Sequence, residues 1–374
     1  MAAKDPTRTR RELLEHVGDL RQWGGTRLVT LEDGAERGVR VIELSTSAGL
    51  DFGVIVDRAL DIGWFRYRGK ACAWLSPTGF AGPWYREPEG LGFLRSFPGG
   101  LTVTCGLDHI LFPQVDPNDT YGYPGRTETS YGLHGRASST PGILRYHGSR
   151  WDGDVCHLTV EGDVRQAGAL AENLLLRRRI STTLDGLEVL IEDEVTNEGH
   201  HPTPHMYLYH MNLGAPLVQA GTELVAPIIE TTWTTPTATR PGEHLEFPAP
   251  EAGFQEQAFL HSMAAADDGT VSLGLVNHAS PDGPWGLEVR YDAEAFPVFL
   301  QWRYLDAGTY VIGFEPSTNG VGGRQADREA GRLIILAPGE ARRYRTLVRV
   351  LPDTAACDDL RDRVGRSLEA ARSS

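Results

Sequence analysis

The sequence predicts an all-β protein: a large antiparallel β-sandwich in a single domain, residues 1–374, with short flanking helices near residues 10–23 and 353–372. From Thr26 onward, short runs of apolar, β-branched and aromatic residues alternate with turn residues. The 43 glycines and 23 prolines are spread along the chain while 40% of it is hydrophobic, which indicates turn-rich β structure rather than disorder. No stretch has the composition of a linker, so one domain is the simplest organisation.

Charge and cysteine usage exclude several classes of partner. The net charge of −14 comes from 50 acids and 36 bases without a basic cluster, which argues against nucleic acid and anionic membranes. No run of about 20 apolar residues predicts a transmembrane helix. The N-terminus lacks the apolar core of a signal peptide, and the cysteines show no C-x-x-C spacing. We therefore expect a cytoplasmic protein with reduced thiols at Cys72, Cys105, Cys156 and Cys357.

The elements follow in chain order. Leucine and valine at near-helical spacing predict an amphipathic helix at the start. An aromatic, loop-rich stretch, residues 77–100, is expected to shape a site or cover an edge. The consecutive acids 192–194 cannot all face one side of a strand, and we expect them to be mostly solvated. Further strands are predicted within residues 27–76, 101–107, 142–165, 173–195, 221–290, 298–314 and 332–351.

Arg58 ends a predicted strand whose residues 52, 54 and 56 are apolar, and it shares their face. It can pair with Asp57 or Asp61 as a half-buried ion pair. Its planar guanidinium can instead bind a hydroxyl or an anion of a ligand. The sequence leaves both interpretations open.

The histidines form a second group of candidates. His134 lies on a loop beside a glycine, where it can approach a ligand or simply remain solvated. Four histidines fall within residues 200–210, but His205 and His210 are separated by an odd number and point to opposite faces of a strand. Neither an i, i+2 spacing nor H-E-x-x-H occurs, so we predict no metal site.

Glu315 lies at the end of a predicted hairpin. Strand-like residues 298–302 and 309–314 are joined by a turn at 306–308, and Pro316 ends the second strand. Desolvation at this rim would raise the pKa of Glu315 toward the range of a proton acceptor. The alternative is an ion pair with a nearby arginine such as Arg303 or Arg324.

Four segments follow one another along the chain: Asp57-Arg58 with Arg68-Gly69-Lys70; Leu133-His134-Gly135; Thr196-Asn197 with Thr203-Pro204-His205-Met206-Tyr207 and His210-Met211-Asn212-Leu213-Gly214; and Gly313-Phe314-Glu315-Pro316, preceded by Phe296-Pro297-Val298-Phe299. In this order they resemble one family, the galactose mutarotase-like, aldose 1-epimerase superfamily, and in particular its branch long carried as a domain of unknown function. Three positions depart from the family pattern: Asp57 replaces an asparagine, Arg136 replaces a second glycine and Ser317 replaces a glutamine.

The resemblance implies a mutarotase that interconverts sugar anomers by acid–base ring opening, with a small-molecule sugar as partner and no cofactor. It assigns the base to Glu315 and the acid to His210. His205 can also be matched to the acid, but His210 is the better match because it is followed by the last residues of the family motif, Asn212-Leu213-Gly214. Substrate-binding roles fall to Arg58, His134, His205 and Arg303.

Two other functions stay open. One is a non-catalytic sugar-binding protein on the same fold. The other is a lyase or a glycosidase, which would need a second carboxylate from Asp61, Asp108 or Glu243. The sequence does not identify the sugar, and it leaves the oligomeric state open, a homodimer included.

Overall fold

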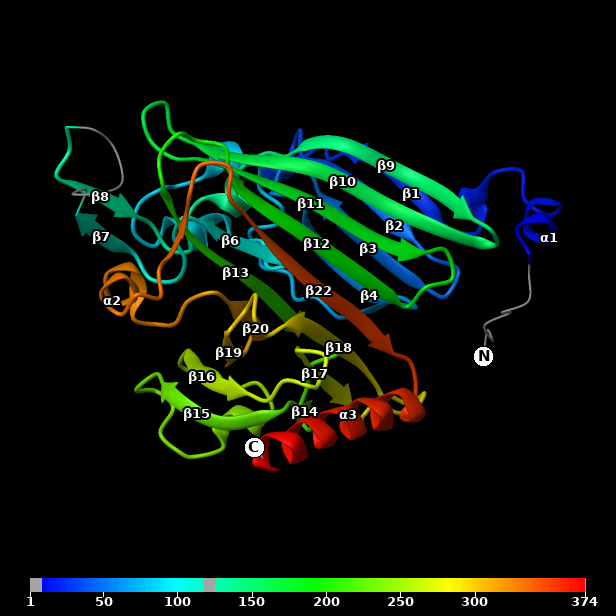
Figure 1. The fold of residues 1–374 in the computed structure, drawn as a ribbon. Coiled ribbons are helices and arrows are strands. Elements are labelled where there is room, and N and C mark those ends of the chain that lie inside the picture. The colour runs from blue at the N-terminus through cyan, green and yellow to red at the C-terminus, as the bar shows by residue number, and fades with distance from the viewer. Residues whose placement is uncertain (1–8, 118–124, 374) are drawn as a thin grey trace.

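The computed structural model describes residues 9–117 and 125–373 and contains three large antiparallel sheets (Figure 1). The five-stranded sheet has the order β1 (Gly25–Thr30), β2 (Arg40–Ser45), β3 (Leu50–Ile55), β4 (Asp61–Tyr67) and β5 (Lys70–Ala71). The eight-stranded sheet has the order β14 (Glu223–Val225), β17 (Thr270–Asn277), β18 (Trp285–Asp292), β22 (Ala341–Leu351), β12 (Glu188–Asn197), β11 (Asn173–Thr183), β10 (Val155–Ala167) and β9 (Ile143–Asp152).

The third sheet carries seven strands, and it is the one that holds the candidate site. Its order is β15 (Ile228–Thr234), β16 (Gln257–Met263), β19 (Val298–Asp306), β20 (Thr309–Ser317), β13 (Thr203–Gly214) and β21 (Ile334–Leu336), with β6 (Val103–Leu107) also paired to β13. A separate hairpin joins β7 (Gln114–Pro117) and β8 (Glu128–Tyr131). This antiparallel, mostly-β architecture confirms the predicted fold class.

Helices are few and lie outside the sheets. The sequence predicts one helix over 10–23, but the structure has two short pieces, because Asp19 caps a new turn with its side chain. The C-terminal helix packs on the eight-stranded sheet through Leu360, next to Gly274 of β17. Among the described residues, no helix is long and apolar enough to cross a membrane. The helices are α1 (Arg10–Leu14), α2 (Gly323–Glu329) and α3 (Thr354–Ser373), with 3-10 turns η1 (Leu20–Gln22), η2 (Gly34–Glu36), η3 (Pro83–Tyr85), η4 (Gly92–Ser96), η5 (Ala137–Ser139) and η6 (Glu243–Leu245).

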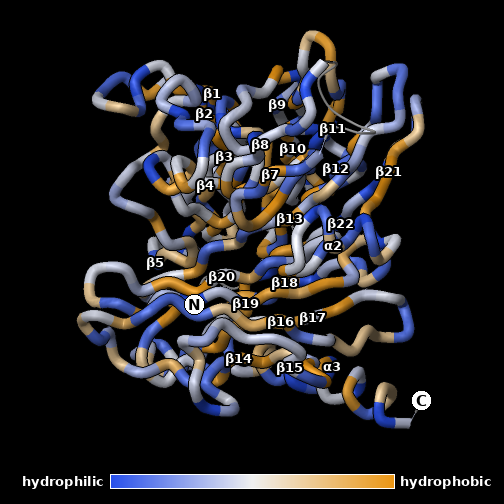
Figure 2. Tube along the Cα trace, turned by 90° about the vertical axis from the view of Figure 1, so that its left-hand side faces the viewer, coloured by the Kyte–Doolittle hydropathy of each residue, from blue (hydrophilic) through white to orange (hydrophobic). Residues whose placement is uncertain are grey.

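One hydrophobic core draws on all three large sheets. Its members run from Leu13 to Val350, and β13 at its centre is buried over all twelve of its residues. Hydrophobic stretches follow the strands β16 to β20, while the connecting loops are largely hydrophilic (Figure 2).

A buried polar network ties the sheets together behind β13. Arg178 of β11 donates to Asp61 of β4 at 2.9 Å, to Asp193 of β12 at 2.7 Å, to Thr104 of β6 at 2.8 Å and to Tyr207 of β13 at 2.9 Å. The expectation that the acids 192–194 are mostly solvated is therefore wrong for Asp193, which points inward because neighbouring residues of a strand face opposite sides.

Candidate functional site

His210 and Glu315 lie side by side on neighbouring strands of the seven-stranded sheet. Strands β13 and β20 are antiparallel, and the pairing of Met211 with Phe314 places His210 opposite Glu315. Opposite residues of adjacent strands project to the same face of a sheet. The two side chains approach with 3.4 Å between Nε2 of His210 and Oε1 of Glu315. The structure thus brings together the residues predicted as acid and base.

The pair is buried, with each residue only 4% exposed. Leu300 of β19 pairs with Glu315 from the other side and belongs to an apolar cluster that also contains Leu208. Burial, together with the charge of Glu256, raises the pKa of Glu315 to about 8. Burial lowers the pKa of His210 to about 4. Between these two pKa values the pair holds one proton.

Three aromatic rings surround the imidazole of His210. Ring centroids lie 5.2 Å away for Phe97, 5.3 Å for Trp302 and 5.4 Å for His134, and all three contacts are edge-on. Phe97 directly follows η4, within the 77–100 stretch that the sequence marks as site-shaping. This loop therefore supplies aromatic surface directly against the acid–base pair.

A left-handed turn positions His134 beside this pair. His134 has φ 58° and Gly135 has φ 73°. The amide of His134 donates to the carbonyl of Leu111 at 2.8 Å, and its carbonyl accepts from the amide of Gly106 at 3.1 Å. A Cβ on Gly135 would lie 2.6 Å from the Gly106 carbonyl oxygen, so a glycine is needed there. Burial lowers the pKa of His134 well below its usual value, which keeps the imidazole neutral.

Buried polar atoms without partners gather at this place. They are Nδ1 of His134, Nδ1 of His210 and Oδ1 of Asn212, whose amide nitrogen is bonded to the His210 carbonyl at 2.9 Å. A side-chain hydrogen bond with Asn212 also acts on the pKa of His210, so Nδ1 of His210 and Oδ1 of Asn212 can satisfy each other. Leaving Nδ1 of His134 unpaired is costly, and a ligand hydroxyl could satisfy it because a hydroxyl both donates and accepts. Across residues 9–117 and 125–373, no group of three His, Cys, Asp or Glu side chains is arranged to hold a metal ion.

The structure places Arg58 under the 77–100 loop rather than against the acid–base pair. Arg58 is 2% exposed and donates to the carbonyls of Ala81 at 2.9 Å and Ser96 at 2.8 Å. The carboxylate of Asp57 binds Arg40 instead, at 2.8 Å from its amide. Arg58 therefore holds the segment that carries Phe97, and sugar binding by Arg58 itself stays a prediction.

His205 lies away from the site, as its strand register requires. It shares the face of Tyr207, opposite to that of His210, and its ring nitrogens are 2.7 Å from the carbonyl oxygen of Leu107 and 2.6 Å from the hydroxyl of Tyr344. Both nitrogens are thus occupied by protein groups, and the arrangement gives His205 no contact with Glu315.

Arg303 also faces the opposite side of its strand. It pairs with Ile312, whereas Trp302 pairs with Gly313 on the face of the acid–base pair. The Arg303 guanidinium donates to Gln257 Oε1 at 2.7 Å and to carbonyls next to η6. The structure does not bring Arg303 together with the acid and the base.

The other carboxylates considered from the sequence are bound elsewhere. Asp61 is paired with Arg178 at 2.9 Å, and Asp108 accepts a hydrogen bond of 2.6 Å from a glutamine of β10. Glu243 accepts from the side chain of Gln257 at 2.9 Å, near Arg303. The carboxylate whose charge acts on Glu315 is instead Glu256, which the sequence did not single out.

Some residues near the pair could have been found by counting. The sequence placed the hairpin turn at 306–308, but Asp306 pairs with Thr309, so the turn has two residues, 307–308; with this turn, Trp302 faces the same side as Gly313, two residues before Glu315. The same count places Arg303 on the other side. Phe97 and Glu256 carry no such local signal, since loops bring them to the site.

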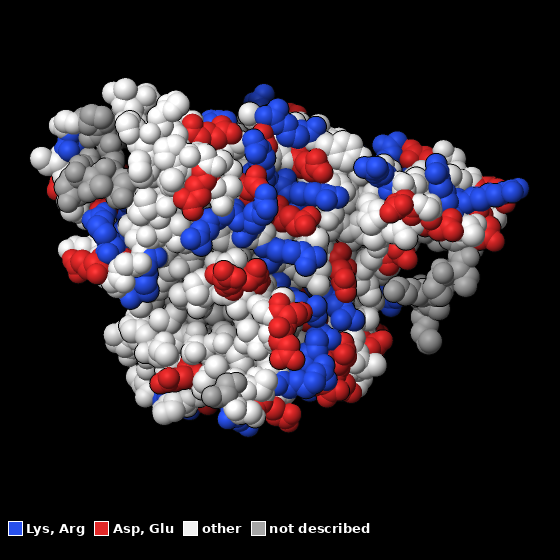
Figure 3. Space-filling model, viewed as in Figure 1, with Lys and Arg blue, Asp and Glu red and all other residues white. Residues whose placement is uncertain are grey.

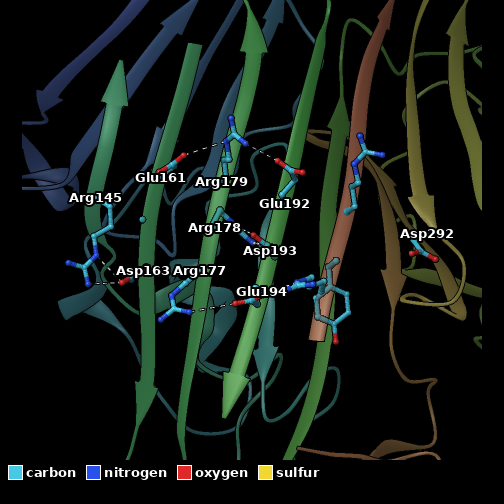
Figure 4. Close-up of a pocket in the computed structure, with 14 residues that line it drawn as sticks. Arg145, Glu161, Asp163, Arg177, Arg178, Arg179, Glu192, Asp193, Glu194 and Asp292 are labelled. Carbon is cyan, nitrogen blue, oxygen red and sulfur yellow. Dashed lines mark hydrogen bonds and ion pairs between the residues drawn. The ribbon is translucent and has the colours of Figure 1, made fainter. Parts of the chain in front are cut away.

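A hollow of about 460 Å³ lies elsewhere, over β10, β11, β12 and β22 (Figure 4). Its side chains alternate in sign across the strands, as in the pairing of Arg145 with Asp163 at 2.6 Å and of Arg177 with Glu194 at 3.5 Å. The same alternation of charges covers this face of the molecule in Figure 3. Opposite charges on adjacent strands stabilise a solvated sheet and do not converge on a ligand.

The chain was compared with known proteins. Its fold matches a Klebsiella pneumoniae protein proposed to be an aldose 1-epimerase, with a TM-score of 0.79 and 21% identity over 92% of this chain and 87% of that one. It also matches a galactose mutarotase-like protein of Clostridium acetobutylicum (TM-score 0.61, 12% identity, 87% and 98% covered). A galactose 1-epimerase of Lactobacillus acidophilus has a TM-score of 0.54 at 15% identity, with 88% and 99% covered.

No curated protein matches the chain. The family described as a domain of unknown function, DUF4432, matches residues 36–350. The chain therefore belongs to the DUF4432 family and has the galactose mutarotase-like fold.

Proposed function

We propose that this protein is a carbohydrate mutarotase that interconverts the anomers of an aldose. The observation that carries the proposal is the 3.4 Å contact between a buried carboxylate and a buried imidazole, Glu315 and His210. Ring opening needs one group that accepts a proton and one that donates it, and this pair holds a single proton near neutrality. The fold shared with aldose 1-epimerases supports the same reaction class.

The proposed reaction consists of proton transfers only. The Glu315 carboxylate takes the proton from the anomeric hydroxyl while protonated His210 gives a proton to the ring oxygen. The bond from C1 to the ring oxygen breaks as the C1 carbonyl forms. Rotation about the C1–C2 bond exposes the other face of the carbonyl, and reversal of both proton transfers closes the ring. The reactive form of the pair is a Glu315 carboxylate beside a His210 imidazolium. It differs from the form with a neutral carboxylic acid and a neutral imidazole only in which residue carries the shared proton.

The surrounding residues have roles that suit this reaction. The neutral ring of His134 can exchange hydrogen bonds with sugar hydroxyls. The ring of Phe97 keeps water from the pair, which strengthens electrostatic interactions within it.

The test is the rate at which a freshly dissolved aldose anomer equilibrates, followed by polarimetry across a panel of neutral and acidic sugars without added metal. We expect acceleration over the uncatalysed rate for at least one sugar. Glu315→Gln should lower the rate about 10²–10⁴-fold, because it removes the proton acceptor but keeps the size of the side chain. His210→Asn should cause a comparable loss.

His205→Asn is the matched control, because it removes a buried histidine of the same strand from the opposite face. We expect it to reduce stability but to leave the rate of the folded protein within a fewfold of the wild type. A Glu315→Gln protein that equilibrates the sugar at nearly the wild-type rate would exclude the assigned base. Sugar binding without any acceleration would favour the binding-protein alternative.

A glycosidase is a second candidate because Glu256 lies close enough to affect Glu315. Two carboxylates on either side of a glycosidic bond are the usual requirement for that reaction. Release of reducing sugar from a set of glycosides distinguishes the two enzymes. The mutarotase proposal expects none.

A further inference from the structure

Trp302 is placed to contact a sugar held by the acid–base pair. Its half-buried indole lies edge-on to the His210 ring at 5.3 Å. Between Trp302 and Glu315 the sheet carries only Gly313, where a Cβ would lie 3.1 Å from Oε1 of Glu315 and 3.2 Å from Cβ of Trp302. Indole, carboxylate and imidazole therefore form one continuous surface on this face of the sheet.

Glu256 fixes the orientation of this indole. Nε1 of Trp302 donates to Oε1 of Glu256 at 2.6 Å. Glu256 is exposed at the end of the segment before β16, so its carboxylate remains open to solvent and to a ligand. The indole is thus held at its polar edge while its faces remain apolar.

We infer that Trp302 is the stacking platform for the apolar face of the sugar ring and that Glu256 orients it and selects neutral sugars over anionic ones. This inference rests on the proposed function, whose substrate class it specifies.

Two physical arguments support it. One face of a pyranose presents several C–H groups, and an aromatic ring offers a flat apolar surface that also fixes the orientation of the ring. A carboxylate beside that surface repels a second negative charge, and an added repulsion is an effective way to reject a competing ligand. The same carboxylate can accept hydrogen bonds from the hydroxyls of a neutral sugar.

The first experiment measures both binding and turnover of a neutral sugar. Trp302→Leu should raise KM and the directly measured Kd about tenfold while changing kcat little, and Trp302→Phe should recover most of the affinity. Trp64→Leu is the matched control, because the Trp64 indole also donates to a carboxylate, Asp51 at 3.0 Å, in the five-stranded sheet. It should leave KM and Kd unchanged.

The second experiment compares a neutral hexose with the corresponding uronic acid. Glu256→Gln keeps a hydrogen-bond acceptor for the indole but removes the charge, so the preference for the neutral sugar should fall roughly fivefold. The alkaline limb of the pH profile should also move to lower pH. Among residues 9–117 and 125–373, the charged or titratable groups that act on Glu315 are His210 from β13, Cys105 from β6 and Glu256, and only Glu256 is changed in this variant.

If the Trp302→Leu variant has the wild-type circular dichroism spectrum and an unchanged Kd, Trp302 is not a stacking platform for the sugar. An unchanged neutral-to-acidic preference in Glu256→Gln would overturn the selection of neutral sugars. Titration calorimetry gives Kd independently of the rate of catalysis, so these outcomes concern binding alone. A failure of the mutarotase proposal would appear differently, as sugar binding without catalysis.

Discussion

At the scale of single residues, the central feature is a buried acid and base that share one proton. Isolated burial of either group is unfavourable for its charged form, which explains why the pKa of Glu315 rises and that of His210 falls. A neutral pair therefore costs less to bury than two separate charges. The same arrangement sets the pH range in which the proposed reaction can run.

We predict a bell-shaped dependence of kcat/KM on pH. Below about pH 4 the pair gains a second proton and Glu315 can no longer accept one. Above about pH 8 the pair loses its last proton and no acid is left. Activity should therefore be highest between these limits and fall about tenfold per pH unit outside them. Polarimetric rates from pH 3.5 to 9.5, on a logarithmic scale, would check both limbs; a rate that keeps rising above pH 9 would contradict the shared-proton assignment.

At the scale of elements, the register of a strand decides which predicted residues meet. His205 and His210 point to opposite faces of the sheet, because an odd number of residues separates them along β13. Arg303 and Trp302 are neighbours in β19 and also point to opposite faces, and the hairpin register places Trp302 on the face of Glu315. The alternation of side chains is enough to predict from the sequence that the two residues of each pair face opposite sides. Which of Arg303 and Trp302 shares the face of Glu315 depends on the turn, which the sequence placed at 306–308 and the structure has at 307–308. The sequence marked residues 77–100 and His134 as candidates, but their contacts with the pair could not be predicted, because these loops are far from β13 and β20 along the chain.

The loop over the site depends on Arg58. Arg58→Ala should lower the free energy of unfolding by about 2–4 kcal/mol, because it leaves the buried carbonyls of Ala81 and Ser96 without donors. It should also speed hydrogen exchange in residues 92–97. Arg95→Ala is the control on the same loop, since the exposed Arg95 forms a surface ion pair with Glu87 at 3.1 Å.

Hydrogen exchange by mass spectrometry and urea unfolding measure the two effects of Arg58→Ala. If exchange in residues 92–97 is unchanged while sugar affinity is lost, the guanidinium binds the sugar directly. That result would favour the ligand-binding interpretation that the sequence leaves open.

At the scale of the whole molecule, the buried Arg178 network joins the three large sheets. Its members come from β4, β6, β11, β12 and β13, so the sheets are held together by polar contacts as well as by the common core. Fold class was predictable because alternation and turn residues repeat along the chain. The network could not be predicted, because Arg178 lies between two other arginines, Arg177 and Arg179, and the sequence does not show which of the three points into the core.

Arg178→Met should destabilise the protein by about 3–5 kcal/mol, because it leaves the carboxylates of Asp61 and Asp193 buried without their cation. Arg177→Met, one residue away on the exposed face, should cost less than about 1 kcal/mol. Urea unfolding of both variants gives the comparison. Similar losses for the two would mean that the buried network contributes no more than a surface ion pair.

The pairing of β13 with β20 also has an evolutionary consequence. The residues proposed to transfer protons, His210 and Glu315, lie on paired strands whose backbone hydrogen bonds fix their separation, whereas Phe97 and His134 lie on loops. Loops tolerate insertions and deletions that a ladder does not. If the proposed function holds, descendants of one ancestral gene can acquire different sugar preferences through changes in these loops while the geometry of the His210–Glu315 pair is inherited unchanged.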